Sequence, residues 1–173
     1  MPPAADEPRR VIPDPGFIDD KGSVAPGVAV ALAAYGSGEG TYAETLAVLQ
    51  HARLLVPVVA VAGELELDAK GLAHDKSSDM ATVLLTGRDG RMALLAFTGL
   101  EPLRAWDPQA RPVPVDAGLA ARAAAQEGAE ALVIDLAGPT RFVIEGDDLA
   151  AVAAGWTLAR VGERTAWIRP PTE

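Results

Sequence analysis

The residues best suited to chemistry lie together in one polar segment, Lys76-Ser77-Ser78-Asp79. Two hydroxyls beside an ammonium group and a carboxylate can hold a small polar ligand or a peptide through several hydrogen bonds. Serine and aspartate side chains also bind nearby backbone groups, so a tight turn is the alternative interpretation. We treat Lys76, Ser77, Ser78 and Asp79 as candidate binding residues, with that alternative kept open.

Two further candidates, Trp106 and Asp135, lie apart from this segment. Asp135 ends an apolar run, a position where α/β proteins place functional carboxylates, although it can equally cap the following turn. Trp106 can stack on a ligand or pack beneath a helix. Arg53 is a charge partner for one of these acids, and the sequence leaves open which one.

The chain lacks the residue sets of the common catalytic and metal sites. Asp68, His74, Asp75 and Asp79 have ligand chemistry, but their spacing fits no metal template, and a solvated acidic loop explains them as well. There is no Gly-x-Ser-x-Gly motif and no cysteine. The glycine-rich residues 36–41 lack the ending of a phosphate loop. We therefore assign no catalytic residue, no metal and no cofactor.

The net charge of −9 is spread evenly along the chain, without a basic stripe. This distribution argues against nucleic acid and against anionic membrane surfaces as partners. No apolar region of the kind found in signal peptides opens the chain, and the longest apolar run, Leu54–Ala62, is too short to cross a bilayer. We expect a cytoplasmic protein, with a homo-oligomer as one option.

Composition divides the chain into three parts. Residues 1–22 contain five prolines and five acidic residues without periodicity, which predicts a disordered N-terminal arm. Residues 23–169 are predicted to form one domain, and residues 170–173 a tail.

Local signals place the elements of that domain. Capping boxes are predicted at Thr41–Glu44 and Thr98–Glu101, and an N-cap at Asp116. Hairpin turns are predicted at Asp89-Gly90 and Gly162-Glu163. The resulting helices are 28–35, 42–50, 99–106, 117–127 and 147–155. The strands are 53–61, 80–87, 91–97, 112–115, 131–136, 141–144, 157–161 and 165–168.

Helices and strands alternate, but two hairpins require antiparallel neighbours. The pattern predicts an α/β (or α+β) fold: a single compact domain with a mixed sheet that contains both hairpins and carries helices on its surface.

Four segments, in order and spacing, resemble the N-terminal domain of the SseB family, the enhanced-serine-sensitivity proteins. They are Ala52–Val58, Lys76–Ala81, Ala96–Gly99 with Trp106, and Glu127–Ala129 leading to Val133–Asp135. The resemblance implies a compact, cytoplasmic α/β domain with no established catalytic residues.

These observations favour a non-enzymatic binding or regulatory module that contacts a protein partner through the polar segment 62–79. A sensor of a small, amino-acid-like ligand is the alternative. A small hydrolase-type enzyme that uses Asp79, Asp135 or His74 is a third hypothesis, and it requires these groups to meet in one cleft.

Overall fold

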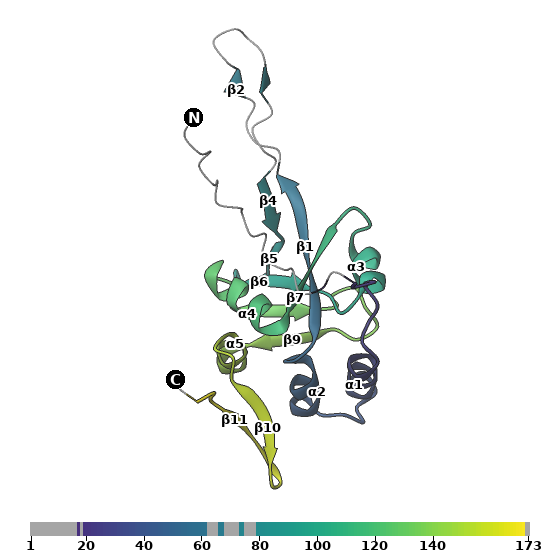
Figure 1. Cartoon of the computed structure of the whole chain (residues 1–173), viewed down its shortest axis with the longest axis vertical. Coiled ribbons are helices and arrows are strands. Elements are labelled where there is room, and N and C mark those ends of the chain that lie inside the picture. Colours follow the sequence, from purple (N-terminus) through teal and green to yellow (C-terminus); the bar gives the residue numbers. More distant parts are fainter. Residues whose placement is uncertain (1–16, 18, 62–65, 68–72, 75–78, 172–173) are drawn as a thin grey trace, which may run out of the picture.

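The computed structural model describes residues 17, 19–61, 66–67, 73–74 and 79–171 (Figure 1). Its centre is a mixed sheet in the order β5-β6-β8-β9, formed by β5 (Leu84–Thr86), β6 (Met92–Ala96), β8 (Ala131–Ile134) and β9 (Phe142–Glu145). Strands β6 and β8 are parallel, and the other neighbours are antiparallel. The carboxyl ends of β6 and β8 therefore meet at the same edge of the sheet.

A second, antiparallel sheet has the order β4-β1-β7, with β4 (Asp79–Thr82), β1 (Arg53–Val61) and β7 (Arg111–Asp116). One bridge joins it to the mixed sheet: the amides and carbonyls of Leu55 and Phe97 exchange hydrogen bonds of 2.7 and 2.8 Å. The bridge brings the start of β1 beside the end of β6, where the site described below is built.

The helices are α1 (Pro26–Ser37), α2 (Tyr42–Leu49), α3 (Leu100–Trp106), α4 (Ala117–Gln126) and α5 (Gly146–Ala153). Alternate residues of β6 face two different cores, because successive side chains of a strand point to opposite faces. Leu94 and Ala96 belong to the larger core, which also takes in residues of α1, α2, α4 and α5. Leu95 and Phe97 belong to a smaller core beneath α3. Helices therefore cover both faces, and the elements form an α+β fold.

Several local predictions are confirmed. Thr41 and Glu44 form the capping box of α2, and Asp116 accepts the amide of Leu119 at the start of α4. The Asp89-Gly90 turn joins β5 to β6, with Gly90 at a φ of 82°. These features depend on a few neighbouring residues, which is why the sequence suffices to predict them.

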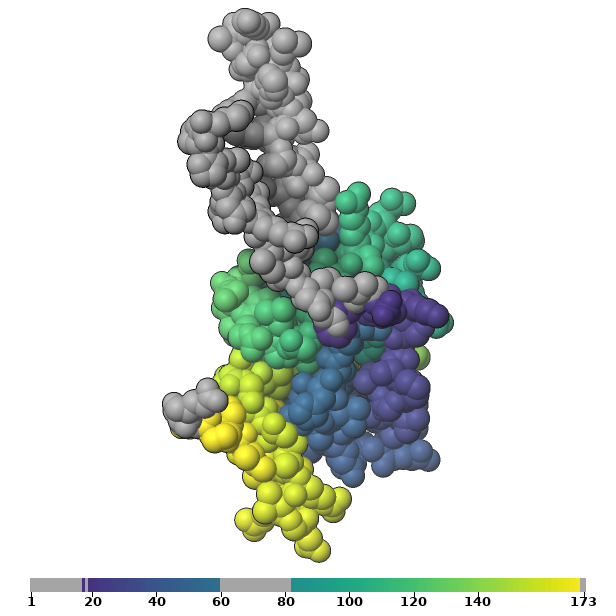
Figure 2. All heavy atoms as spheres, viewed as in Figure 1, coloured from purple at the N-terminus to yellow at the C-terminus, as the bar shows by residue number. Residues whose placement is uncertain are grey.

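The second predicted hairpin also forms, from β10 (Thr157–Val161) and β11 (Arg164–Ile168), but as a sheet of its own. Gln50 attaches it to the body, because its side chain donates to the carbonyl of Leu158 and accepts the amide of the same residue. Figure 2 shows the hairpin protruding from the rest of the molecule.

Two strand predictions differ from the structure. The strand predicted over residues 80–87 is divided: β4 pairs with β1, and β5 pairs with β6. The polar segment 62–79 contains a short ladder between β2 (Glu66–Leu67) and β3 (Ala73–His74). The division of 80–87 follows from the long-range pairing of β4 with β1, which the local pattern does not reveal, whereas β2 and β3 pair locally. None of the described helices is long and apolar enough to cross a membrane.

Candidate functional site

The site is built around Asp135, which follows the last residue of β8 and is 4% exposed. Its φ of 54° lies in the left-handed region, and among the described residues it is the one non-glycine residue with a positive φ. Aspartate tolerates this conformation better than most residues, because its short polar side chain forms local hydrogen bonds. The turn at Asp135 ends the strand and redirects the chain.

The side chain of Asp135 replaces its own carbonyl in the parallel ladder. The Asp135 amide donates to the carbonyl of Ala96 at 3.0 Å, so a regular ladder would next join the Thr98 amide to the Asp135 carbonyl. The turn removes that carbonyl, which instead accepts the amide of Gly138 at 2.9 Å. The Thr98 amide donates to Oδ1 of Asp135 at 2.8 Å in its place.

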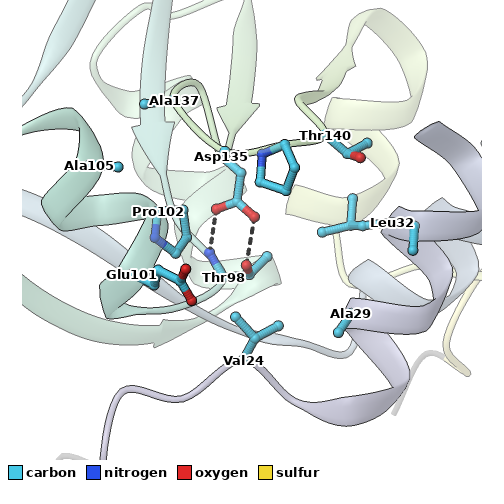
Figure 3. Close-up of a pocket in the computed structure, with 13 residues that line it drawn as sticks. Val24, Ala29, Leu32, Thr98, Glu101, Pro102, Ala105, Asp135, Ala137 and Thr140 are labelled. Carbon is cyan, nitrogen blue, oxygen red and sulfur yellow. Dashed lines mark hydrogen bonds between the residues drawn. The ribbon is translucent and has the colours of Figure 1, made fainter.

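Thr98 also donates its hydroxyl to Oδ2 of Asp135, at 2.6 Å (Figure 3). The capping box predicted at Thr98–Glu101 is therefore wrong. Helix α3 begins after Gly99 at the N-cap, and no side chain caps it. The Thr98 hydroxyl binds the Asp135 carboxylate and does not cap α3, because hydrogen bonds to an ionised group are shorter and stronger than those between neutral groups.

A cavity of about 370 Å³ lies over this pair, and Pro102 and Leu32 flank it on opposite sides in Figure 3. Its walls come from the segment before α1, from α1, from α3 and from the turn after Asp135. The lining residues are Val24, Ala29, Leu32, Ala33, Thr98, Glu101, Pro102, Ala105, Asp135, Ala137, Gly138, Pro139 and Thr140. The cavity lies at the carboxyl ends of two parallel strands, the usual place for ligands in sheets that contain parallel strands.

Electrostatics distinguish Asp135 from the other lining residues. Burial is the main cause that raises the pKa of Asp135, and the two hydrogen bonds from Thr98 partly oppose it. The second ionisable lining residue is Glu101, whose side chain is exposed. No lysine, arginine or histidine lies among the lining residues of this cavity. The pocket is thus mostly apolar, and the ionisable groups among its described lining residues are both acidic.

Arg53, the first residue of β1, connects the site to the N-terminal segment. Its guanidinium donates to the carbonyl of Thr98 at 2.9 Å and to the carbonyl of Ser23 at 2.6 Å. It also binds Asp20, with 2.6 Å between Nε and Oδ2. We call Asp20–Val24 the strap, because these contacts hold it across the end of the sheet and place Val24 in the pocket wall.

Arg53 was predicted to pair with one of the candidate acids, and the structure shows it paired with Asp20, which is not one of them. Residues 20–22 belong to the segment predicted as an arm, and here they are attached to the domain. Residues 1–16 lie outside the described residues, and the predicted domain boundaries stay predictions.

Of the two candidate residues whose side chains the structure describes, Asp135 lines the pocket and Trp106 does not. Lys76, Ser77 and Ser78 lie outside the described residues, and so does the side chain of Asp79, whose backbone begins β4 opposite Val61. Trp106 packs on Phe97, with ring centroids 5.6 Å apart, in the smaller core. The candidate site that the described residues form therefore lies at the end of the mixed sheet.

Thr98 as the partner of Asp135 and α1 as a pocket wall were not predicted from the sequence. One signal was available: Phe97-Thr98 and Ile134-Asp135 both place a polar residue directly after an apolar strand. That pattern predicts a shared edge only if the two strands are known to be parallel neighbours, which the sequence does not reveal. Within the described part of the chain, no group of three or more metal-binding side chains is found.

Comparison with known families gives one match. The family model described as the SseB protein N-terminal domain matches residues 28–151. This range includes α1 from Val28 onward, Thr98 and Asp135, whereas the strap and the β10–β11 hairpin lie outside it. No curated protein and no solved structure matches the chain significantly.

Proposed function

This chain belongs to the SseB family, whose N-terminal domain it matches, and we propose that it is a non-enzymatic binding module. Its ligand occupies the pocket over Asp135. The proposal rests on one observation: a carboxylate that is 4% exposed forms the base of a cavity with mostly apolar walls. Pockets that bind small molecules commonly combine apolar walls with a few polar groups that orient the ligand.

The hydrogen-bond capacity of Asp135 supports a ligand. An ionised carboxylate has about four acceptor sites, and Thr98 fills two of them. Burial removes most of the water that would otherwise fill the others, which is costly for a charged group. A ligand that brings hydrogen-bond donors into the cavity restores this lost solvation. The volume of about 370 Å³ suits a small molecule.

The chemistry of the lining favours binding over catalysis. Among the lining residues that the structure describes, Asp135 and Glu101 are the ionisable ones, and the hydroxyl held by Asp135 belongs to Thr98. A carboxylate is a weak base for activating an alcohol, and neither histidine nor lysine lines the pocket to assist it. The hydrolase hypothesis also requires Asp79 or His74 beside Asp135, and the side chains of both residues lie outside the part of the chain that the structure describes.

A protein partner at residues 62–79 stays a prediction of the sequence, because most of that segment lies outside the described residues. A binding module can serve both roles if a ligand in the pocket controls the surface that a partner recognises. The pocket is the part of this proposal that the described residues allow us to argue and to test directly.

The test is a thermal-shift screen of amines, amides, alcohols and amino acids at millimolar concentration. A ligand at 100 times its Kd stabilises the folded state by about 2.7 kcal/mol, which is roughly 5–10 °C in Tm for a chain of this size. Ala33→Leu fills the cavity from α1 and is expected to abolish the shift.

Ala150→Leu is the matched control, because this exposed alanine of α5 lies outside the cavity lining. Shifts that persist unchanged in Ala33→Leu would place the binding site elsewhere. A screen without any shift in the unmodified chain would contradict the proposal as a whole.

A further inference from the structure

We infer that the pocket selects an alkylammonium ion with a short aliphatic body and no anionic group. This inference rests on the proposed function, because it concerns the ligand of the same cavity. It also separates two ligand classes that the sequence alone could not separate, amines and zwitterionic amino acids.

Among the described lining residues, no side chain carries a positive charge that could bind an anion. Asp135 and Glu101 are both acidic, and α1, which supplies one wall, contains no charged residue. Arg53, whose guanidinium binds the Thr98 carbonyl at the base, also binds Asp20 and the Ser23 carbonyl. The carboxylate of a bound amino acid would face negative charge without compensation.

Three backbone amides around the base already donate to acceptors of the protein itself. The Thr98 amide donates to Asp135, the Gly138 amide to the Asp135 carbonyl and the Leu100 amide to the Gly22 carbonyl. Pro139 and Pro102 have no amide hydrogen to offer. These positions therefore offer no backbone amide to an anion of the kind that glycine-rich loops bind.

An ammonium group is a better hydrogen-bond donor to the Asp135 carboxylate than a hydroxyl is. An ammonium group carries three donors and a positive charge, whereas a hydroxyl carries one donor and no charge. Hydrogen bonds between ionised partners are about twice as strong as those between neutral ones. Val24, Leu32 and Ala29 then offer apolar contact to the rest of the molecule. A short branched alkyl chain attached to an ammonium group satisfies both requirements.

The experiment uses three probes with the same aliphatic body on the full chain. Leucine differs from 3-methylbutylamine only by its α-carboxylate, and 3-methylbutan-1-ol replaces the ammonium group by a hydroxyl. Binding is measured by isothermal titration calorimetry and by amide chemical shifts of Ala33, Thr98 and Gly138. We expect 3-methylbutylamine to bind at least about tenfold more tightly than either other probe.

Two variants test the origin of this preference. Asp135→Asn keeps an acceptor for the Thr98 amide and is expected to remove the preference for the amine over the alcohol. Ala33→Lys, on the exposed side of α1, adds a cation to the lining and is expected to shift the preference toward leucine. Ala150→Lys adds the same charge outside the cavity and is expected to leave the preference unchanged.

The outcomes distinguish an error in the ligand class from an error in the binding pocket itself. Leucine or the alcohol binding at the pocket amides as tightly as the amine would overturn the ligand class and leave the pocket in place. If none of the three probes changes the chemical shifts of these amides, the proposed ligand class is wrong. The binding pocket itself is contradicted only if the thermal-shift screen also finds no ligand.

Discussion

The guanidinium of Arg53 binds the carboxylate of Asp20 at 2.6 Å, and their side chains are only 16% and 13% exposed. This pair joins the segment before α1 to the first residue of β1. Since Arg53 also binds the carbonyl of Thr98, the attachment of the strap and the base of the pocket share one residue. The pocket wall at Val24 therefore depends on an ion pair that lies outside the cavity.

Asp20→Asn should detach the strap. Removing one partner of a buried ion pair costs roughly 3 kcal/mol, because the other charge stays buried without compensation. Trypsin cleavage after Lys21 should then become about 100-fold faster when cleavage follows the population of the open form. Mass spectrometry of the Lys21 fragment measures this rate. Asp19→Asn, at the exposed neighbouring position, is the control, and equal rates in the two variants would show that the ion pair does not hold the strap.

Gly99→Ala should detach the strap by a steric route. A Cβ at Gly99 would lie 2.7 Å from Cγ2 of Val24 and 3.0 Å from the carbonyl oxygen of Gly22. We expect faster cleavage after Lys21 and a lower Tm. Gly27→Ala in α1 meets nothing within 4 Å and should raise stability by about 0.5–1 kcal/mol. A Tm that rises in both variants would contradict the close packing of the strap on Gly99.

Thr98→Val should cost about 1–3 kcal/mol, because it leaves one oxygen of the buried Asp135 without its hydroxyl donor. Thr98→Ser keeps the hydroxyl and should retain most of the stability. Urea unfolding measures both variants. A double-mutant cycle with Asp135→Asn should show a coupling energy, whereas purely additive effects would mean that the Thr98 hydroxyl acts independently of Asp135.

Asp135→Asn should change how stability depends on pH. Burial raises the pKa of Asp135 in the folded state above the unfolded value of about 3.9, so the folded state holds this proton more tightly. The resulting stabilisation is complete below the unfolded pKa and is lost as the pH rises through the folded pKa. Unmodified protein should therefore gain stability relative to Asp135→Asn as the pH falls.

Urea titrations between about pH 3 and 7 measure this difference, and each unit of pKa change corresponds to about 1.4 kcal/mol. Asp147→Asn, an exposed position in α5, controls for the loss of one negative charge. A constant difference between Asp135→Asn and the unmodified protein across this range would contradict the direction of the pKa change.

The candidate site could be predicted only in part. Asp135 was identified because it ends an apolar strand, which is a local pattern. Thr98 was misassigned because its spacing to Glu101 also fits a capping box, and both interpretations satisfy the same local rules. The outcome depended on whether β6 and β8 are parallel neighbours, since only that arrangement brings the Asp135 carboxylate to the Thr98 amide.

The sequence by itself determined the family, the α+β class and the local helix caps and turns, such as the Thr41–Glu44 capping box and the Asp89-Gly90 turn. These features depend on residues within a few positions of one another, whose conformational preferences act before any long-range contact forms. Tertiary structure alone decided the pocket, the pairing of Arg53 with Asp20 and the role of Thr98. Each joins residues more than thirty positions apart, and strand pairing and burial, rather than local preference, determine which distant side chains meet.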